Sequence, residues 1–241
     1  MRWHTYIIAA SALALVVSFW NRNTFVDPAA LLPAIDAEPE QRKTLRRAFD
    51  ARWQGDAYQI TPEFDYELTG LVVSFRQHDG NSRMHQRSAD HLNVADLCVV
   101  WAGTARNPHL NKVSFWNGVF TCNFKTTDRA AWEAFDIHQI SNNHLLSDDP
   151  TIRNAIDDVR IGDQITLRGS LASYVSPNGS KRGTSVTRQD TGNGACETIY
   201  VDSFEILQRS TSGWRMLMYV SLCVFLISLF GYVMTPHKVR Q

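Results

Sequence analysis

The sequence predicts a mainly β domain with helical additions, flanked by two transmembrane helices. Long apolar segments without a formal charge lie near both ends of the 241-residue chain. Between them, short runs of apolar residues at a spacing of two are separated by turns that contain glycine, a pattern typical of β-strands. A chain of this length has room for one good-sized domain, and we expect one.

The first apolar segment comprises residues 3–20 and carries no formal charge between Arg2 and Arg22. We expect the N-terminal transmembrane segment to span residues 1–22. At about 1.5 Å per residue, a helix of this length just crosses the hydrocarbon core of a bilayer. A cleaved signal peptide has a similar basic start, but the bulky and polar sequence SFWNRNTF offers no small-residue cleavage site. We therefore favour an uncleaved signal anchor, with a cleaved signal peptide as the alternative.

Residues 23–55 are expected to form a juxtamembrane linker followed by a helix. Pro39 suits the first turn of a helix. Leu45, Phe49 and Trp53 recur every four residues, which is the spacing of one apolar helix face. The rest of this helix is basic, so it would dock on the domain or lie against lipid headgroups. The narrow apolar stripe favours docking.

Residues 56–210 are expected to form the extracytoplasmic β-rich domain. The clearest strand patterns are at 65–76, 95–101, 113–124, 160–175 and 196–207. The sequence DDP at 148–150 predicts the start of a short helix, since acidic residues favour the first turn. GDQITLRGSL, followed by a closing strand, is similar to the later half of an OB-type barrel. We therefore predict a small OB-like barrel or a sandwich.

The second apolar segment, residues 214–235, is richer in Leu, Ile, Val and Phe and is the stronger transmembrane prediction. A short tail, 236–241, follows it. Arg2 at one end and Lys238 with Arg240 at the other make both tails basic. The positive-inside rule then predicts a bacterial inner-membrane protein with two spans, both termini in the cytoplasm and the central domain in the periplasm.

The charge distribution bears on the expected partners. The region between residues 21 and 214 holds all 24 acidic residues but only 20 of the 24 basic ones. This acidic balance disfavours nucleic acid as a partner. The expected partners are the lipid bilayer, through the two transmembrane segments, and an envelope protein.

Two motifs resemble a family of uncharacterised bacterial membrane and envelope proteins. SNNHLL at 141–146 is similar to an S-x-N-x-H-L stretch of that family. SVTRQDTGNGACE at 185–197 matches its S-x-T-R-x-D-T-G-x-G-A-C-E stretch closely. The resemblance covers about 66–207. The family has no known activity, so the resemblance implies no function.

The four cysteines suggest one possible disulfide. Cys223 lies within the second apolar segment and is expected to pack there. If 97–101 and 119–121 were antiparallel neighbours, Cys98 would face Cys122 and a cross-strand bridge would be possible. Such a bridge would add about 2–4 kcal/mol in an oxidising compartment. Two buried thiols are the alternative.

Cys196 and His144 could form a nucleophile–base pair, with Asn143 orienting the imidazole ring. Cys196 also opens an apolar strand, however, and free cysteine is among the most buried residue types. The expectation is therefore that GNGACE forms a turn leading into a core strand, with catalysis and disulfide pairing as the alternatives.

Arg188, Asp190 and Glu197 could bind a small ligand or form an ion-paired loop in which Asp190 accepts backbone hydrogen bonds. A polar loop also contains three histidines, at spacings unlike those of known metal ligands. These are His78, His85 and His91. Neither a metal nor another cofactor is expected.

The function expected from these patterns is that of a membrane-anchored, non-catalytic interaction or assembly module of the cell envelope. One alternative is a membrane-tethered thiol enzyme that uses Cys196 and His144. Another is a small-ligand sensor. Whether any catalysis occurs stays open at this stage, and the sequence names neither a partner nor a substrate.

Overall fold

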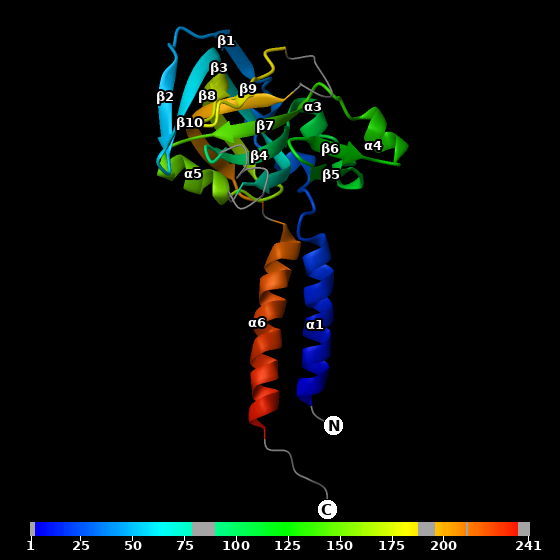
Figure 1. The fold of residues 1–241 in the computed structure, drawn as a ribbon. Helices are drawn as coiled ribbons and strands as arrows, with labels where there is room; N and C mark the ends of the chain where they lie inside the picture. The colour runs from blue at the N-terminus through cyan, green and yellow to red at the C-terminus, as the bar shows by residue number, and fades with distance from the viewer. Residues whose placement is uncertain (1–2, 79–89, 188–195, 211, 236–241) are drawn as a thin grey trace, which may run out of the picture. The chain divides into compact units, whose positions relative to one another are not determined.

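The structure is a computed structural model that describes residues 3–78, 90–187, 196–210 and 212–235 (Figure 1). The chain divides into two compact units. One joins the N-terminal and C-terminal segments, Met1–Val26 and Thr211–Gln241, and the other is Asp27–Ser210. Each unit is described by itself.

The first unit is a pair of apolar helices, α1 (Trp3–Asn21) and α6 (Gly213–Met234), each long and apolar enough to cross a membrane. This confirms the two flanking apolar helices. The helices pack against each other and bury four serines. These are Ser11, Ser18, Ser221 and Ser228. Small side chains let helix backbones approach closely, and the hydroxyls of the first two donate to carbonyls of the preceding turn.

The second unit is mainly β sheet with short helices, as predicted. Its larger sheet contains β1 (Glu40–Lys43), β2 (Phe49–Trp53), β3 (Asp56–Gln77), β4 (Asn93–Val100), β7 (Ile140–Leu146), β8 (Gln164–Val175), β9 (Lys181–Arg182) and β10 (Glu197–Gln208). Short 3-10 turns precede it, η1 (Pro28–Ala30) and η2 (Pro33–Asp36). The helix α5 (Pro150–Asp157) lies between β7 and β8 in the sequence and begins at the DDP pattern, as predicted. The Asp149 side chain caps its N-terminus.

Five strands are hydrogen-bonded in a ring, in the order β3, β4, β7, β10, β8 and back to β3. All neighbours are antiparallel except β7 and β10, which run parallel. The contact between β8 and β10 is very close at Gly169. A Cβ atom at this position would collide with the backbone carbonyl of Tyr200, so the closure between these strands requires glycine.

The two faces of β4 and β7 differ in chemistry because successive side chains on a strand point to opposite sides. Leu97, Val99 and Leu145 belong to the main hydrophobic core, together with residues of β3, β8 and β10. Asp96 and His144, at the alternate positions, are also buried. Their face of the sheet is therefore a buried polar layer.

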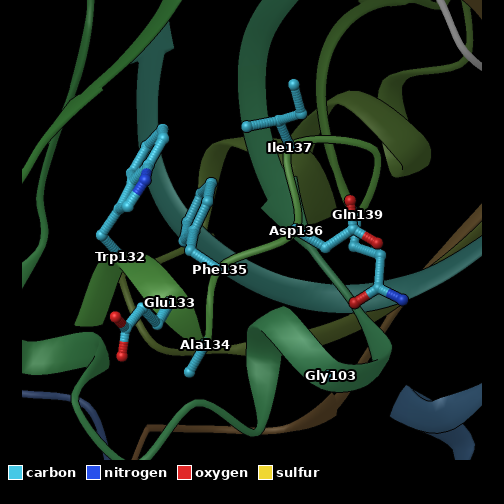
Figure 2. Close-up of a pocket in the computed structure, with 8 residues that line it drawn as sticks. All are labelled: Gly103, Trp132, Glu133, Ala134, Phe135, Asp136, Ile137 and Gln139. Atoms are coloured by element: carbon cyan, nitrogen blue, oxygen red, sulfur yellow. The ribbon is translucent and has the colours of Figure 1, made fainter. Parts of the chain in front are cut away.

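An insertion between β4 and β7 contributes the cover of this layer. It consists of α3 (Ala102–Ala105), η3 (Leu110–Lys112), β5 (Ser114–Asn117), β6 (Cys122–Lys125) and α4 (Arg129–Glu133). β5 and β6 pair as a separate hairpin. Beside α4 lies a pocket of about 550 Å³ lined by Trp132, Phe135 and Ile137, among others (Figure 2).

A disulfide joins Cys98 of β4 to Cys122 of β6, with a Cα–Cα distance of 5.4 Å. Of the two alternatives that the sequence left open, a bridge or two buried thiols, the structure has the bridge. The strand pairing from which we inferred it is wrong, since β4 pairs with β3 and β7, whereas β6 pairs with β5. The bridge links two sheets instead of two neighbouring strands.

The predicted helix after Pro39 is also wrong, because β1 and β2 occupy this segment and pair with β3. A spacing of four residues fits a helical period and also a strand period of two. In β2, Phe49 and Trp53 are partly buried on either side of fully buried Ala51. Leu45, the first member of the supposed helical stripe, is 98% exposed between the strands.

Candidate thiol site

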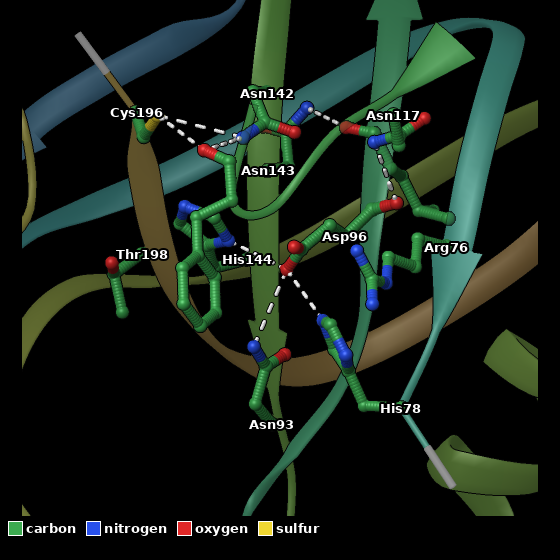
Figure 3. Close-up of polar contacts among 12 residues, drawn as sticks. Arg76, His78, Asn93, Asp96, Asn117, Asn142, Asn143, His144, Cys196 and Thr198 are labelled. Atoms are coloured by element: carbon green, nitrogen blue, oxygen red, sulfur yellow. Dashed lines mark hydrogen bonds and ion pairs between the residues drawn. The ribbon is translucent and has the colours of Figure 1, made fainter. Parts of the chain in front are cut away.

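The polar layer brings together side chains from three adjacent strands (Figure 3). His144 of β7 pairs in register with Asp96 of β4 on one side and with Thr198 of β10 on the other. Cys196 immediately precedes β10. Asn142 lies two residues before His144, so both side chains project from the same face of β7.

Asp96 is the centre of this layer and is fully buried. Its Oδ1 atom lies 2.6 Å from His144 Nδ1, 3.0 Å from His78 Nε2 and 3.3 Å from Asn93 Nδ2. Burial alone would raise the pKa of this carboxyl group. The hydrogen bonds from the two histidines outweigh burial and hold the pKa well below its usual range. Asp96 is therefore an anion.

His144 is hydrogen-bonded to the Asp96 carboxylate, and its ring lies near enough to the Cys196 thiol for the sulfur to act on its pKa. Burial alone would lower the pKa of His144. The hydrogen bonds and charges of Asp96 and Cys196 outweigh this effect and raise the pKa to about 9. His144 is therefore an imidazolium at neutral pH.

Cys196 is half-buried and is not part of a disulfide. Its Sγ atom lies 3.5 Å from the backbone oxygen of Phe120 and 3.5 Å from Asn142 Nδ2. Asn142 Nδ2 also donates to the same Phe120 oxygen at 3.0 Å. The sulfur, the amide nitrogen and the carbonyl oxygen thus form a small triangle.

The Phe120 side chain covers the two histidines. Its ring is edge-on to His144, at 5.7 Å between centroids, and lies 6.2 Å from His78. The guanidinium of Arg182 stacks on the Phe120 ring at 3.7 Å. Asp96 and His144 project from the face of the sheet that lies opposite the main hydrophobic core. The Phe120 ring covers this face and shields the pair from water.

A thiol, an imidazole and a carboxylate connected in this order have the parts that nucleophilic catalysis requires. The histidine exchanges a proton with the sulfur, and the carboxylate fixes the ring and balances its charge. Strongly shifted pKa values that arise from specific charged partners are a feature of functional sites.

The structure brings Cys196 and His144 together but gives Asn143 a different place. Asn143 points to the opposite side of β7, where its Nδ2 donates to Leu97 O at 3.2 Å and to Ser141 Oγ at 2.8 Å. Asp96, which the sequence interpretation missed, contacts the imidazole instead. The available signal was an aspartate within the apolar run ADLCVVW, because a buried carboxylate needs partners.

Of the predicted ligand-binding residues, Glu197 begins β10 and pairs in register with Asn143. Arg188 and Asp190 lie outside the described residues. Among the three histidines of the polar loop, His85 also lies outside them. Across the part of the chain that the structure describes, no group of three or more His, Cys, Asp and Glu side chains is arranged to hold a metal ion.

Comparisons with models of known protein families, with curated proteins and with solved structures find no match to this chain. The case for a function therefore rests on the geometry of the polar layer.

Proposed function

We propose that this protein is a membrane-anchored thiol enzyme that transfers or hydrolyses acyl groups. Cys196 is the nucleophile, His144 is its base and acid, and Asp96 orients the imidazole ring. The observation that carries the proposal is the position of His144, whose ring is hydrogen-bonded to the Asp96 carboxylate and lies near enough to the Cys196 thiol for the sulfur to act on its pKa.

The proposed reaction begins with the thiol proton on His144. The Cys196 sulfur attacks the carbonyl carbon of an ester or thioester, forming a C–S bond and a tetrahedral oxyanion. The bond to the leaving group then breaks as His144 gives its proton to that group. Water attacks the resulting thioester with His144 as the base, which releases a carboxylic acid and regenerates the thiol.

Energetic cost supports a functional role for this cluster. A buried ion pair contributes little net stability, because the desolvation of both ions offsets their attraction. Apolar side chains at the positions of Asp96 and His144 would fill the same space without this cost. Their placement beside a half-buried thiol is explained if their charges act on that thiol.

We also infer that the strand ring is an OB-like barrel in the periplasm. The ring order, the parallel pair of β7 and β10, and the helix between β7 and β8 support the barrel. The periplasmic placement is supported by the basic tails and by the Cys98–Cys122 disulfide, since disulfides persist in oxidising compartments. In barrels of this kind, the outer face of the second and third strands binds ligands, and β4 and β7 hold those positions.

The test is the reactivity of Cys196 in the full chain in detergent micelles. Alkylating reagents attack the thiolate form of cysteine, and a positively charged neighbour favours that form. At pH 6, His144→Asn is expected to slow alkylation of Cys196 by iodoacetamide by about tenfold or more. Mass spectrometry of the Cys196 peptide measures the rate.

The matched control is His138→Asn, which removes an exposed histidine from the same domain. Its alkylation rate should equal that of the unmodified chain. Equal rates in the His144→Asn and His138→Asn proteins would remove the basis for an activated thiol.

A second candidate is the non-catalytic interaction module, and the pocket beside α4 favours it. Trp132 and Ile137 line this pocket and are 54% and 39% exposed. Exposed tryptophans of this kind are frequent anchors of protein interfaces.

This candidate predicts that a photo-crosslinking side chain at Ile137 captures one envelope protein in intact cells. Trp132→Ala should then reduce the adduct by about tenfold, which corresponds to loss of one interface anchor. Arg129→Ala, an exposed change on the same helix but outside the pocket lining, should leave the adduct intact. An adduct that is insensitive to Trp132→Ala argues against this surface.

A further inference from the structure

We propose that Asn142 supplies the oxyanion donor of the thiol site, and that the Phe120 carbonyl is a built-in occupant of the position that a substrate's carbonyl takes. The Cys98–Cys122 disulfide holds this occupant in place. The inference rests on the proposed acyl transfer and names a further catalytic residue and a control element for it.

The first step is the position of the Phe120 oxygen. An acyl substrate must place its carbonyl carbon about 3–3.5 Å from the nucleophile, and its carbonyl oxygen about 2.7–3.1 Å from a donor. The Phe120 oxygen lies 3.5 Å from Cys196 Sγ and 3.0 Å from Asn142 Nδ2. The Phe120 oxygen accepts from both groups and so occupies the place beside the thiol and the amide donor that the oxygen of a substrate carbonyl would take.

The second step is the placement of Asn142. Its Nδ2 atom lies 3.5 Å from the Cys196 sulfur, so a tetrahedral centre formed on that sulfur has this amide beside it. The Asn142 Oδ1 atom makes no hydrogen bond to the described residues, so the contacts of this amide are made by its nitrogen. An amide nitrogen beside the nucleophile is a typical donor for an oxyanion.

The third step is the attachment of the occupant. We call residues 113–125, which contain β5 and β6, the strap. Besides the disulfide, Asn117 fixes the strap by accepting from Ser74 Oγ at 2.6 Å and donating to Asp96 O at 3.3 Å. Arg76 also donates to Gly118 O at 3.3 Å.

The backbone of Phe120 is strained within this strap. Its φ angle is +57°, in the left-handed region that residues with a side chain seldom adopt. Such a conformation persists only where surrounding contacts enforce it. Loss of the tether therefore favours relaxation of Phe120 and withdrawal of its carbonyl from Cys196.

The tether can be cut by a dithiol reductant. One thiolate of the dithiol attacks a sulfur of the Cys98–Cys122 bond, and its second thiol then displaces the protein sulfur and closes a new disulfide. Two electrons and two protons pass to the protein, which gains two thiols. Cys122 is partly exposed on the strap, whereas Cys98 is buried in β4, so the reductant reaches Cys122 first.

The test measures the alkylation rate of Cys196 in two samples of the full chain in micelles. One sample is oxidised. The other has been reduced with dithiothreitol, which is removed before alkylation. Reduction is expected to raise the rate of iodoacetamide modification at the Cys196 peptide by about tenfold or more. A Cys98→Ala/Cys122→Ala chain should react at the fast rate without reductant. Near-UV circular dichroism verifies that both chains stay folded.

Asn117→Ala provides a second way to loosen the strap, since it removes two side-chain contacts and keeps the disulfide. It should raise the alkylation rate of the oxidised chain. Equal alkylation rates in the oxidised, reduced and Asn117→Ala proteins would overturn the role of Phe120 as an occupant.

The role of Asn142 is tested by hydrolysis of p-nitrophenyl acetate by the reduced chain. Asn142→Ala should lower kcat by about 100-fold, the usual effect of removing one oxyanion donor. Its effect on alkylation should be far smaller, because displacement at iodoacetamide forms no oxyanion. Asn154→Ala, which removes an exposed amide from α5, is the control.

The outcomes separate the two proposals. An equal loss of both reactions in the Asn142→Ala protein would overturn the oxyanion role. Faster alkylation after reduction without any ester hydrolysis would refute acyl transfer and the role of Asn142, and would leave occlusion by Phe120 standing. Ester hydrolysis that is insensitive to reduction would support the enzyme and refute the strap.

Discussion

Asp96→Ala is expected to lower the free energy of unfolding of the domain by about 3–5 kcal/mol, because it removes the anion from a buried charge cluster. The carboxylate is fully buried, and its Oδ1 atom lies within hydrogen-bond distance of a ring nitrogen of His144 and of His78. Without it, an imidazolium would lack a counter-charge. Denaturant unfolding of the full chain in micelles, followed by near-UV circular dichroism, measures the loss.

Two variants make this result specific. Asp96→Asn keeps the shape and one acceptor oxygen, so it should cost less than Asp96→Ala. Asp202→Ala removes an exposed ion pair with Arg46. Both charges of this pair are well solvated, so the free energy of unfolding should fall by less than about 1 kcal/mol. A loss from Asp96→Ala as small as that from Asp202→Ala would show that the buried cluster does not carry the stability of this layer.

The sequence was informative where local patterns decide the structure. The strands around Leu97, Leu167 and Ile199 follow from apolar alternation, and the cap of α5 follows from Asp149 before Pro150. The two apolar helices follow from length and composition. Each of these features depends on neighbours within a few residues, so a single sequence contains the necessary information.

Features that depend on long-range register were missed. The contact of Asp96 with His144 joins residues 48 positions apart and requires β4 and β7 to pair in one particular register. The position of Phe120 requires an insertion to fold back onto the sheet from which it departs. The pairing of Cys98 with Cys122 was only one of two alternatives, and it was reached through a strand arrangement that does not exist. It therefore gave no information on how the insertion covers the polar layer.

The segment before β3 shows a different limit. Residues 45, 49 and 53 satisfy a helical period, and their spacing of four also satisfies a strand period. What decides between them is the long β3, because its edge opposite β8 would otherwise lack partners at residues such as Tyr66 and Ile60. The tertiary demand for strand pairing thus overrides the local helical signal.

The stability of the domain should also fall as the pH rises from about 6.5 to about 9. An unperturbed histidine has a pKa of 6.5, and the folded protein raises the pKa of His144 to about 9. A raised pKa means that the stabilising contribution is complete below 6.5 and is lost as the pH approaches the folded value. This shift corresponds to a contribution on the order of 3 kcal/mol.

The acid side behaves in the opposite way. The pKa of Asp96 is lowered from 3.8 on folding, so its contribution is present above that value and is lost as the pH falls below it. Full stabilisation by the pair is therefore expected from about pH 5 to 6.5. Unfolding of the full chain and of its His144→Asn variant across pH 4–10 measures the profile, with His138→Asn as the control for an exposed histidine.

The difference in stability between the unmodified chain and His144→Asn should shrink between pH 6.5 and 9, and the His138→Asn chain shows what the loss of an exposed histidine does by itself. A constant difference for His144→Asn would mean that the ring stays in one protonation state throughout, and would contradict its pairing with Asp96 as an imidazolium. The same proton has a second use in the proposed reaction, since His144 gives it to the leaving group. Ester hydrolysis by the reduced chain should therefore decline over the same alkaline range in which the stability declines.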